Sequence, residues 1–145
     1  MHGRDWFVHI GSMVITRLNP EQLHPTAGYA HVTIVDAGRL AVLAGQCPLD
    51  RDAKLVGRGD ILSQVDQIVA NATEALAAAG TSPENVVRSV IYVVSTDPSV
   101  LSSVWDRLTG SSIGPAFTTA STLLGVTALG YRDQLVEVDL TATLP

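Results

Sequence analysis

Residues 60–94, DILSQVDQIVANATEALAAAGTSPENVVRSVIYVV, predict a helix followed by a strand, and this pair decides the fold class. Apolar residues recur every three or four positions over residues 61–79, which predicts one apolar face of a helix about five turns long. Asp60 can cap this helix by accepting a backbone N–H bond, and Gly80 can end it in the left-handed conformation. Residues 86–94 are rich in β-branched side chains, which favour an extended strand.

The segments on either side of this pair predict further strands and a second helix. Upstream, three segments have strand-like composition, and they are residues 14–18, 29–35 and 39–44. The turn signal at residues 36–38, Asp-Ala-Gly, predicts that the last two form a hairpin. Downstream, Asp97-Pro98 is typical of a helix start, and Gly110 of its end. Two extended segments close the chain, residues 116–129 and 134–144.

The resulting order is β-β-β-α-β-α-β-β, with no internal repeat and no linker long enough to divide it. We therefore expect an α+β fold, in which two helices cover one face of a mixed sheet of about six strands. The other face of that sheet must meet solvent or another subunit.

Composition indicates one globular domain that associates with itself. Apolar residues make up 46% of the 145 residues and charged residues only 16%, which leaves few charges to solvate the surface of a monomer. We expect the domain to span residues 13–145. Residues 1–12 have no clean period, and we interpret them as an N-terminal extension or a remnant of cloning.

Charge and residue content argue against several classes of function. The net charge is −5 and no basic stripe exists, which disfavours nucleic-acid binding. No long apolar run or signal-peptide pattern is found, so we expect no membrane association and a cytoplasmic location. Cys47 is the single cysteine, and no His, Cys, Asp or Glu pair has metal-ligand spacing. We expect no metal and no cofactor.

Several motifs occur in an order that resembles one known family. Gly28-Tyr29 precedes a strand, AGRL lies at residues 37–40, and AGQCPLD lies at residues 44–50. The helix carries Gln64 and Asn71, and ASTLLGVTAL (residues 120–129) and LVEVD (residues 135–139) follow. Together these pieces, spread over residues 13–144, resemble the Rid family, also called YjgF and related to the endoribonuclease L-PSP proteins.

The resemblance implies a chorismate-mutase-like α+β fold and a homotrimer whose sheets form a barrel-like centre. It also implies that small ligands bind in clefts between neighbouring subunits. The best-known activity of the family is the hydrolysis of reactive enamines and imines to ammonia and a 2-keto acid. This chain is expected to be a hydrolase of that kind, a deaminase acting on a C=N bond.

One position departs from the family pattern. Active members bind the substrate carboxylate with an arginine on the penultimate strand, and Ser121 stands at that position here. Arg132, on the final turn, is the nearest alternative that follows it. Glu137 matches the family glutamate that positions or activates water, because hydrolysis of C=N needs a base near the attacking water. Its alternative role is that of a solvated carboxylate.

The resemblance implies a set of substrate-binding residues: Tyr29, Ala44, Gly45, Gln46, Ser121 and Trp105. Tyr29 could stack on a ligand or be a half-buried strand aromatic, and Trp105 could line the cleft or pack in the core. Gly45-Gln46 would allow close approach of the backbone to a ligand. Cys47 is expected to be an inert thiol.

Two functions follow from these residues. The first is an imine or enamine hydrolase whose substrates are less anionic than those of the family, because Ser121 carries no charge. The second is a non-catalytic trimer that binds a metabolite or regulates a partner, because the arginine is missing and Ala44 replaces a serine that is frequent in the family. Ribonuclease activity, attributed to some relatives, is disfavoured by the acidic charge balance.

Overall fold

The computed structural model describes residues 3–10, 13–36 and 38–145, and side chains from residue 14 onward within these ranges. Its helices and strands are, in chain order, β1 (Gly3–Ile10), β2 (Met13–Pro20), β3 (Val32–Val35), β4 (Leu40–Val42), α1 (Ile61–Ala78), β5 (Val86–Val94), α2 (Pro98–Thr109), β6 (Ala120–Val126) and β7 (Val136–Thr143). Two short 3₁₀ helices, η1 (Pro83–Asn85) and η2 (Gly114–Phe117), precede β5 and β6.

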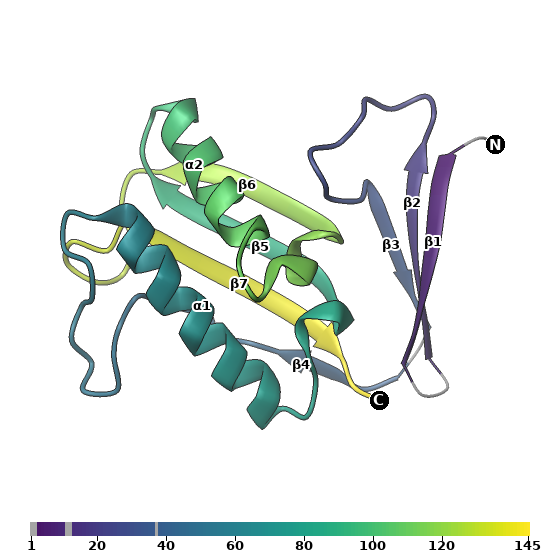
Figure 1. Ribbon diagram of the computed structural model, residues 1–145, viewed down its shortest axis with the longest axis horizontal. Helices are drawn as coiled ribbons and strands as arrows, with labels where there is room; N and C mark the ends of the chain where they lie inside the picture. Colours follow the sequence, from purple (N-terminus) through teal and green to yellow (C-terminus); the bar gives the residue numbers. More distant parts are fainter. Residues whose placement is uncertain (1–2, 11–12, 37) are drawn as a thin grey trace.

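The centre of the molecule is a four-stranded mixed sheet with the order β4-β7-β5-β6, called the main sheet below. β5 pairs parallel with β6 and antiparallel with β7, which also pairs antiparallel with β4. Both helices lie on one face of this sheet (Figure 1). The expected α+β class, with two helices on one side of a mixed sheet, is therefore confirmed.

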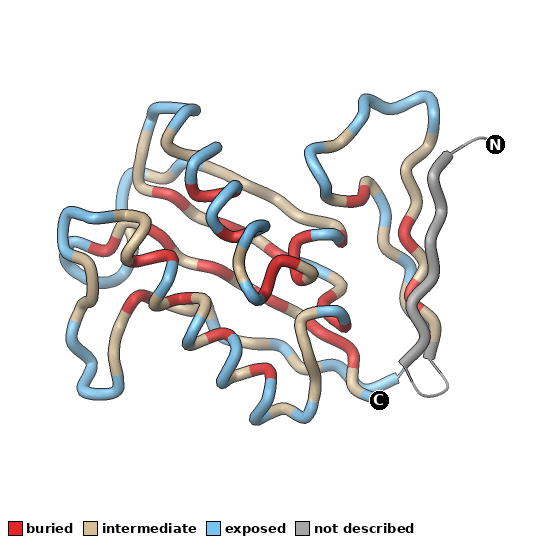
Figure 2. Tube along the Cα trace, in the orientation of Figure 1, coloured by how far each residue is buried: buried red, intermediate tan, exposed pale blue. Residues whose placement is uncertain are grey.

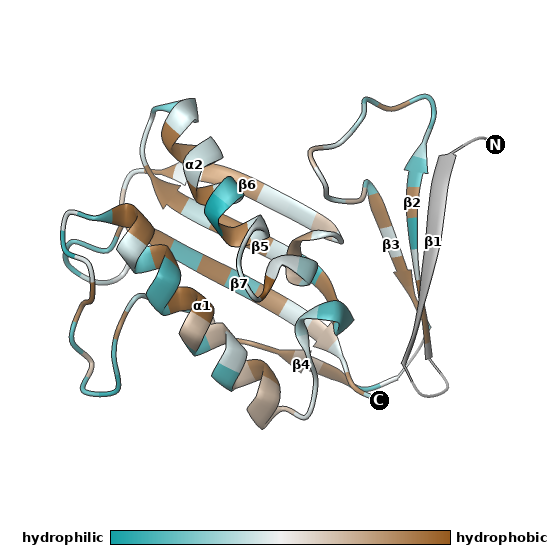
Figure 3. Ribbon diagram, viewed as in Figure 1, coloured by the Kyte–Doolittle hydropathy of each residue, from teal (hydrophilic) through white to brown (hydrophobic). Residues whose placement is uncertain are grey.

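The core fills the space between the helices and the main sheet. Every second residue of β7, from Val136 through Val138 to Leu140, is buried against apolar residues of α1 and α2. Figure 2 shows that many of the buried residues lie in the two helices and in the strands that they cover. Figure 3 shows polar and apolar residues alternating along β7. The period-two pattern of the sequence thus becomes a two-faced strand.

The helix ends lie where the sequence predicts them. The Asp60 carboxylate accepts a hydrogen bond from the backbone N–H of Ser63, and Asp97 accepts one from that of Ser99. Gly80 follows the last residues of α1 with φ of +79°, which is the left-handed conformation that favours glycine. Within the described ranges, neither helix is long and apolar enough to cross a membrane.

Strands β1, β2 and β3 form a separate antiparallel sheet, called the arm below. The arm lies beyond one end of the main sheet (Figure 1). It is joined there by a bridge between Ala30 and Ala120, and by the Thr33 hydroxyl, which accepts the N–H of Ala120 at 2.9 Å. Arg17 of β2 is buried at this junction, with 1% of its surface exposed, and donates to the carbonyl of Val86 at 3.1 Å.

All six expected strands are present, but the hairpin predicted at residues 36–38 is wrong. Among the described residues, β3 pairs with β2 and β4 pairs with β7, and no pairing joins β3 to β4. Ala37 itself lies outside the described residues. The turn signal depends on three neighbouring residues, whereas β3 is held by contacts with distant ones. It pairs with β2, and the hydroxyl of Thr33 lies 2.6 Å from that of Thr119. β1 falls within residues 1–12 and pairs along its full length with β2.

Candidate functional site

Glu137 and Asp139 lie on the face of the main sheet that the helices leave uncovered. Val136 and Val138 alternate with them and point into the core, so the two carboxylates point the other way. Tyr92, opposite Glu137 in the register of β5 and β7, points to the same side and donates to Asp139 Oδ2 at 3.2 Å. This side of the main sheet is called the carboxylate face below.

Two neighbours hold the carboxylate of Glu137 in one orientation. Cys47 Sγ donates to Glu137 Oε1 at 3.2 Å, and Gln134 Nε2 donates to the same oxygen at 3.1 Å. Gln134 is itself buried and also donates to the carbonyl of Val136. Both contacts engage Oε1, and among the described side chains none donates a hydrogen bond to Oε2.

Gly45 lies against the free side of this carboxylate. A Cβ added there would meet Glu137 Cδ at 2.8 Å and Asp139 Oδ1 at 3.0 Å, closer than real side chains approach. Gln46 ties the segment to β7 through its backbone, with its N–H 2.8 Å from the carbonyl of Val138. A side chain at position 45 would therefore displace the Glu137 carboxylate from its present orientation.

Helix α1 positions the segments that carry these contacts. Asn71 Nδ2 donates to the carbonyls of Cys47 and Leu49, each at 2.9 Å. Gln64 is fully buried, and its side-chain oxygen accepts the N–H of Leu135 at 2.8 Å. The two helix residues that carry part of the family resemblance thus fix the loops on either side of Glu137.

The thiol and the phenol of the carboxylate face keep their protons more strongly than usual. Burial raises the pKa of the Cys47 thiol to about 11, and the hydrogen bond to Glu137 adds to the effect. Burial also raises the pKa of Tyr92, with a further contribution from the negative charge of Asp139. Cys47 is therefore a neutral donor to Glu137 at neutral pH, which agrees with the inert thiol expected from the sequence.

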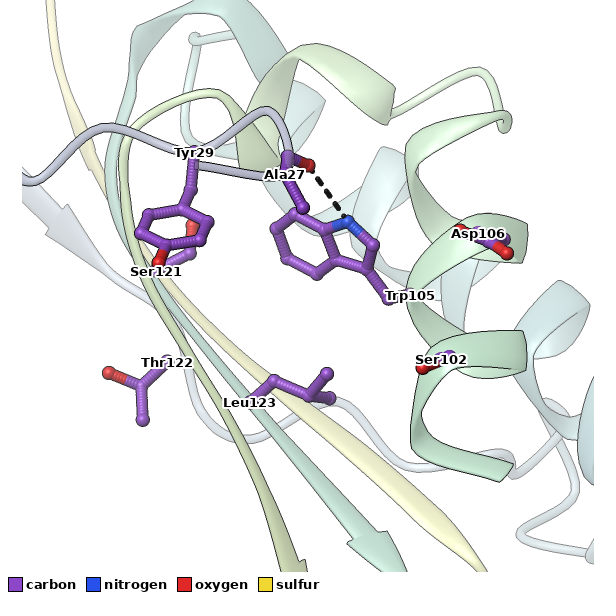
Figure 4. A pocket seen from close by; sticks show the side chains of 8 residues that line it. All are labelled: Ala27, Tyr29, Ser102, Trp105, Asp106, Ser121, Thr122 and Leu123. Atoms are coloured by element: carbon purple, nitrogen blue, oxygen red, sulfur yellow. Dashed lines mark hydrogen bonds between the residues drawn. The ribbon is translucent and has the colours of Figure 1, made fainter. Parts of the chain in front are cut away.

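A second feature is a pocket between α2, β6 and the loop that precedes β3 (Figure 4). Its volume is about 520 Å³, and its lining is Ala27, Tyr29, Ser102, Trp105, Asp106, Ser121, Thr122 and Leu123. Tyr29 and Trp105 meet edge to face with ring centroids 6.2 Å apart. Trp105 Nε1 donates to the carbonyl of Ala27 at 3.1 Å, so this side chain both packs in the core and lines the pocket.

Ser121 belongs to the pocket and not to the carboxylate face. It lies opposite Ser89 in the register, and Ser89 lies opposite the core residue Leu140. The Ser121 hydroxyl is hydrogen bonded to that of Ser89 and to the carbonyl of Thr119. Its side chain therefore points to the helix side of the sheet, away from Glu137.

The residues expected from the sequence thus form two groups. Tyr29, Trp105 and Ser121 come together in the pocket, whereas Ala44, Gly45, Gln46 and Glu137 gather on or beside the carboxylate face. Asp139, Tyr92, Cys47 and Gln134 complete the second group and were not predicted as site residues. Alternation alone could have placed Asp139 and Tyr92, but their partners depend on register, which the sequence does not reveal. Among the described residues, no three His, Cys, Asp or Glu side chains are grouped to hold a metal.

Comparison with known proteins finds one matching family model and a related protein. The family model described as Endoribonuclease L-PSP matches residues 20–144. The protein DfrA of Myxococcus xanthus is 34% identical over 116 residues, which cover 79% of this chain and 83% of that protein.

Solved structures show the same likeness. The protein YyfB of Yersinia pestis, described as a protein of unknown function of the conserved Rid family, superposes with a TM-score of 0.82 at 34% identity, covering 90% of this chain and 98% of that one. Rv2704 of Mycobacterium tuberculosis, a member of the YjgF/YER057c/UK114 family, gives a TM-score of 0.58 at 29% identity, covering 81% and 88% of the two chains.

Proposed function

The chain belongs to the Rid/YjgF family, and we propose that it hydrolyses the C=N bond of small imines, including those that form from enamines by tautomerisation, in a cleft between two copies of itself. The observation that carries this proposal is the carboxylate of Glu137. It is held by Cys47 and Gln134 through one oxygen, and its other oxygen faces the backbone at Gly45.

The arrangement suits a general base. Glu137 Oε2 accepts a proton from water while the water oxygen bonds to the imine carbon and the π electrons move to nitrogen. Glu137 passes that proton to the nitrogen, which gives a neutral carbinolamine. The hydroxyl proton of the carbinolamine then moves to the nitrogen as the C=O double bond forms and the C–N bond breaks, which releases ammonia and a carbonyl compound. The fixed orientation of the carboxylate lowers the cost of ordering this step.

The cleft between copies follows from the two faces of the sheet. Tyr29, Trp105 and Ser121 lie on the helix side, and Glu137 lies on the other side, so one small ligand does not reach both groups within one chain. Two copies can bring the pocket of one chain against the carboxylate face of the next. We propose that this assembly is a homotrimer that works in the cytoplasm on small-molecule ligands.

A second candidate function is metabolite binding without turnover. The Ser121 hydroxyl already has protein partners, and Ala44 offers no polar side chain, so the two positions where relatives bind ligand are weakened. This function predicts saturable binding of a small molecule with no product formed.

The first test is a coupled assay in which a threonine dehydratase generates the imine and the release of keto acid is followed. Wild-type protein should accelerate release, and Glu137→Gln should lower the acceleration about a hundredfold, because the amide is not a base. Glu74→Gln, at an exposed position of α1, is the matched control and should keep the wild-type rate. Equal rates for Glu137→Gln and wild type would contradict the proposal.

Mixed assemblies test whether the site is shared between copies. Glu137→Gln and Tyr29→Ala each remove one half of the cleft, so either variant alone should be impaired. After co-expression in equal amounts, a site shared by neighbours should recover to about one quarter of the wild-type rate, because random assembly leaves one cleft in four intact. No recovery would place both halves in one chain and would exclude the shared cleft.

A further inference from the structure

Two histidines meet on the loop that joins β2 to β3. The rings of His24 and His31 lie edge to face with their centroids 4.7 Å apart, although seven positions separate the two residues in the sequence. The chain reverses between them, because the Thr26 hydroxyl donates to the carbonyl of Tyr29 at 2.6 Å and Gly28 takes a φ of +103°. The fold of the loop, and not the spacing in the sequence, therefore brings this pair together.

Each ring has one nitrogen bound to the backbone, which leaves the other nitrogen with a lone pair. Nδ1 of His24 lies 3.0 Å from the carbonyl oxygen of Pro25, and Nε2 of His31 lies 2.8 Å from that of His24. A carbonyl oxygen only accepts hydrogen bonds, so these two nitrogens carry the protons. In the neutral rings the lone pairs are then on Nε2 of His24 and Nδ1 of His31. A histidine that ligates a metal is held in the same way, since its second nitrogen donates to a carbonyl, a carboxylate or water.

The separation of the two rings fits two ligands of one metal ion. Zinc binds imidazole nitrogen at about 2 Å, so two imidazoles on one ion have centroids roughly 4.5 to 5 Å apart. The rings of His24 and His31 already have this separation. His24 is exposed, and exposed side chains change rotamer within nanoseconds, so its ring can turn its lone pair onto an ion.

The surroundings of the pair favour a small cation that keeps part of its water. His24 and Glu21 line a separate pocket of about 350 Å³, and the carboxylate of Glu21 adds negative charge there. Among the described residues no third His, Cys, Asp or Glu is grouped with the pair to hold a metal, so water must fill the remaining positions on the ion. Imidazole suits zinc, copper and nickel, whereas magnesium and calcium prefer oxygen ligands.

The pair lies at one end of a row of aromatic rings that leads to the pocket beside α2. His31 meets Tyr29 edge to face with ring centroids 5.8 Å apart, and Tyr29 meets Trp105 in the same way inside the pocket (Figure 4). The backbone N–H of His31 also donates to Asn19 Oδ1 at 2.9 Å, which ties this end of the loop to β2. An ion that joins His24 to His31 would therefore close the loop that carries Tyr29.

We infer that His24 and His31 bind one divalent transition metal ion of the zinc type, with water in its remaining positions. The ion joins the two sides of the loop and holds Tyr29 beside the pocket. This site departs from the expectation of no metal, which was based on spacing in the sequence. It uses none of the residues of the carboxylate face and does not depend on the proposed hydrolysis.

Titration calorimetry with Zn²⁺ on the full-length protein tests the site. The chain has four histidines, so the measurements start from a variant, called the background, in which the other two, His2 and His9, are replaced by glutamine. The background should bind about one Zn²⁺ per chain, and His24→Gln and His31→Gln should each weaken this binding roughly tenfold or more, because each removes one of two protein ligands. Mg²⁺ should not bind there, because it prefers oxygen ligands.

Two further measurements complete the test. Cys47→Ser is the control variant, because a thiol is the other soft ligand that the chain offers, and it should bind Zn²⁺ as the background does. Hydrogen exchange of residues 21–31 should slow when Zn²⁺ is added to the background, because the ion closes the loop. The same addition should leave the exchange of His24→Gln unchanged.

The inference is overturned if the background does not bind Zn²⁺, or if either histidine variant binds it as the background does. Affinity that is lost in Cys47→Ser but kept in His24→Gln would place the metal at the carboxylate face and would also overturn it. Zinc binding through both histidines without slower exchange would support the site and contradict its role in holding Tyr29.

Discussion

The main sheet and the arm are stabilised by different forces. The main sheet and its helices enclose one continuous apolar core, to which both helices and β5 and β7 contribute. Among the described side chains of the arm, Ile15 packs with Val35 and with Val87 of β5, and the hydrogen bonds of Arg17 and Thr33 join the arm to the rest of the molecule. The comparison teaches that the carboxylate face is formed by strands of the packed core, whereas the loop before β3 reaches that core through Tyr29, which packs against Trp105.

Phe117→Ala removes a side chain from the packed core and should have the largest effect on stability. Phe117 is fully buried among core residues and meets Trp105 with ring centroids 6.1 Å apart. Truncation of a buried phenylalanine leaves a cavity and should lower the free energy of unfolding by about 3–5 kcal/mol. Urea denaturation followed by tryptophan fluorescence measures this, and a loss below about 1 kcal/mol would mean that the core is not closed there.

Arg17→Ala removes hydrogen bonds at the junction between the arm and the rest of the molecule, and it should have a smaller effect on stability. Two carbonyls, those of Val86 and Glu84, lose their donor, so the free energy of unfolding should fall by about 2 kcal/mol. Hydrogen exchange should quicken in β2 and β3 but not in β7, which separates local release of the arm from global unfolding.

Arg17→Met sharpens the same comparison. Arg17 Nε is buried without a partner among the described residues, and burial lowers the pKa of the guanidinium. Burial of this charge therefore reduces the stability of the folded protein. Methionine keeps much of the packing and avoids that cost but does not replace the two hydrogen bonds, so its stability should lie between those of wild type and the alanine variant. A loss as large as that of the alanine variant would show that the hydrogen bonds, and not the packing, hold the arm.

The pH dependence of stability that Cys47 causes reports on the carboxylate face. Because the pKa of the folded thiol is raised to about 11 from 9.0, the unfolded chain loses its proton first as the pH rises. The contribution of this thiol to stability is therefore complete below pH 9 and is lost between pH 9 and about 11. Cys47→Ser should lack this component in urea denaturation at pH 8 and pH 10.5.

Alkylation of Cys47 checks the same shift kinetically. At pH 8 iodoacetamide should modify the folded protein roughly tenfold or more slowly than the urea-unfolded chain, since the thiolate is the reactive form. Equal rates would show that the thiol is not held neutral beside Glu137.

Local features of the site were predictable, and its assembly was not. The alternation over residues 134–144 places Glu137 and Asp139 on one face, and the glycine of AGQCPLD marks a close approach of backbone. The resemblance brought Ser121 and Glu137 into one site, but the register puts them on opposite faces of the main sheet.

The sequence by itself determined the helices, their caps at Asp60 and Asp97, and which residues of each strand share a face. These are properties of short segments, set by side-chain periodicity and local hydrogen bonds. Only the tertiary structure decided that β3 pairs with β2 and not with β4, and that the pocket and the carboxylate face lie on opposite sides of the main sheet. These depend on strand order and register, which are set by contacts between residues far apart in the chain and are not encoded in any one segment.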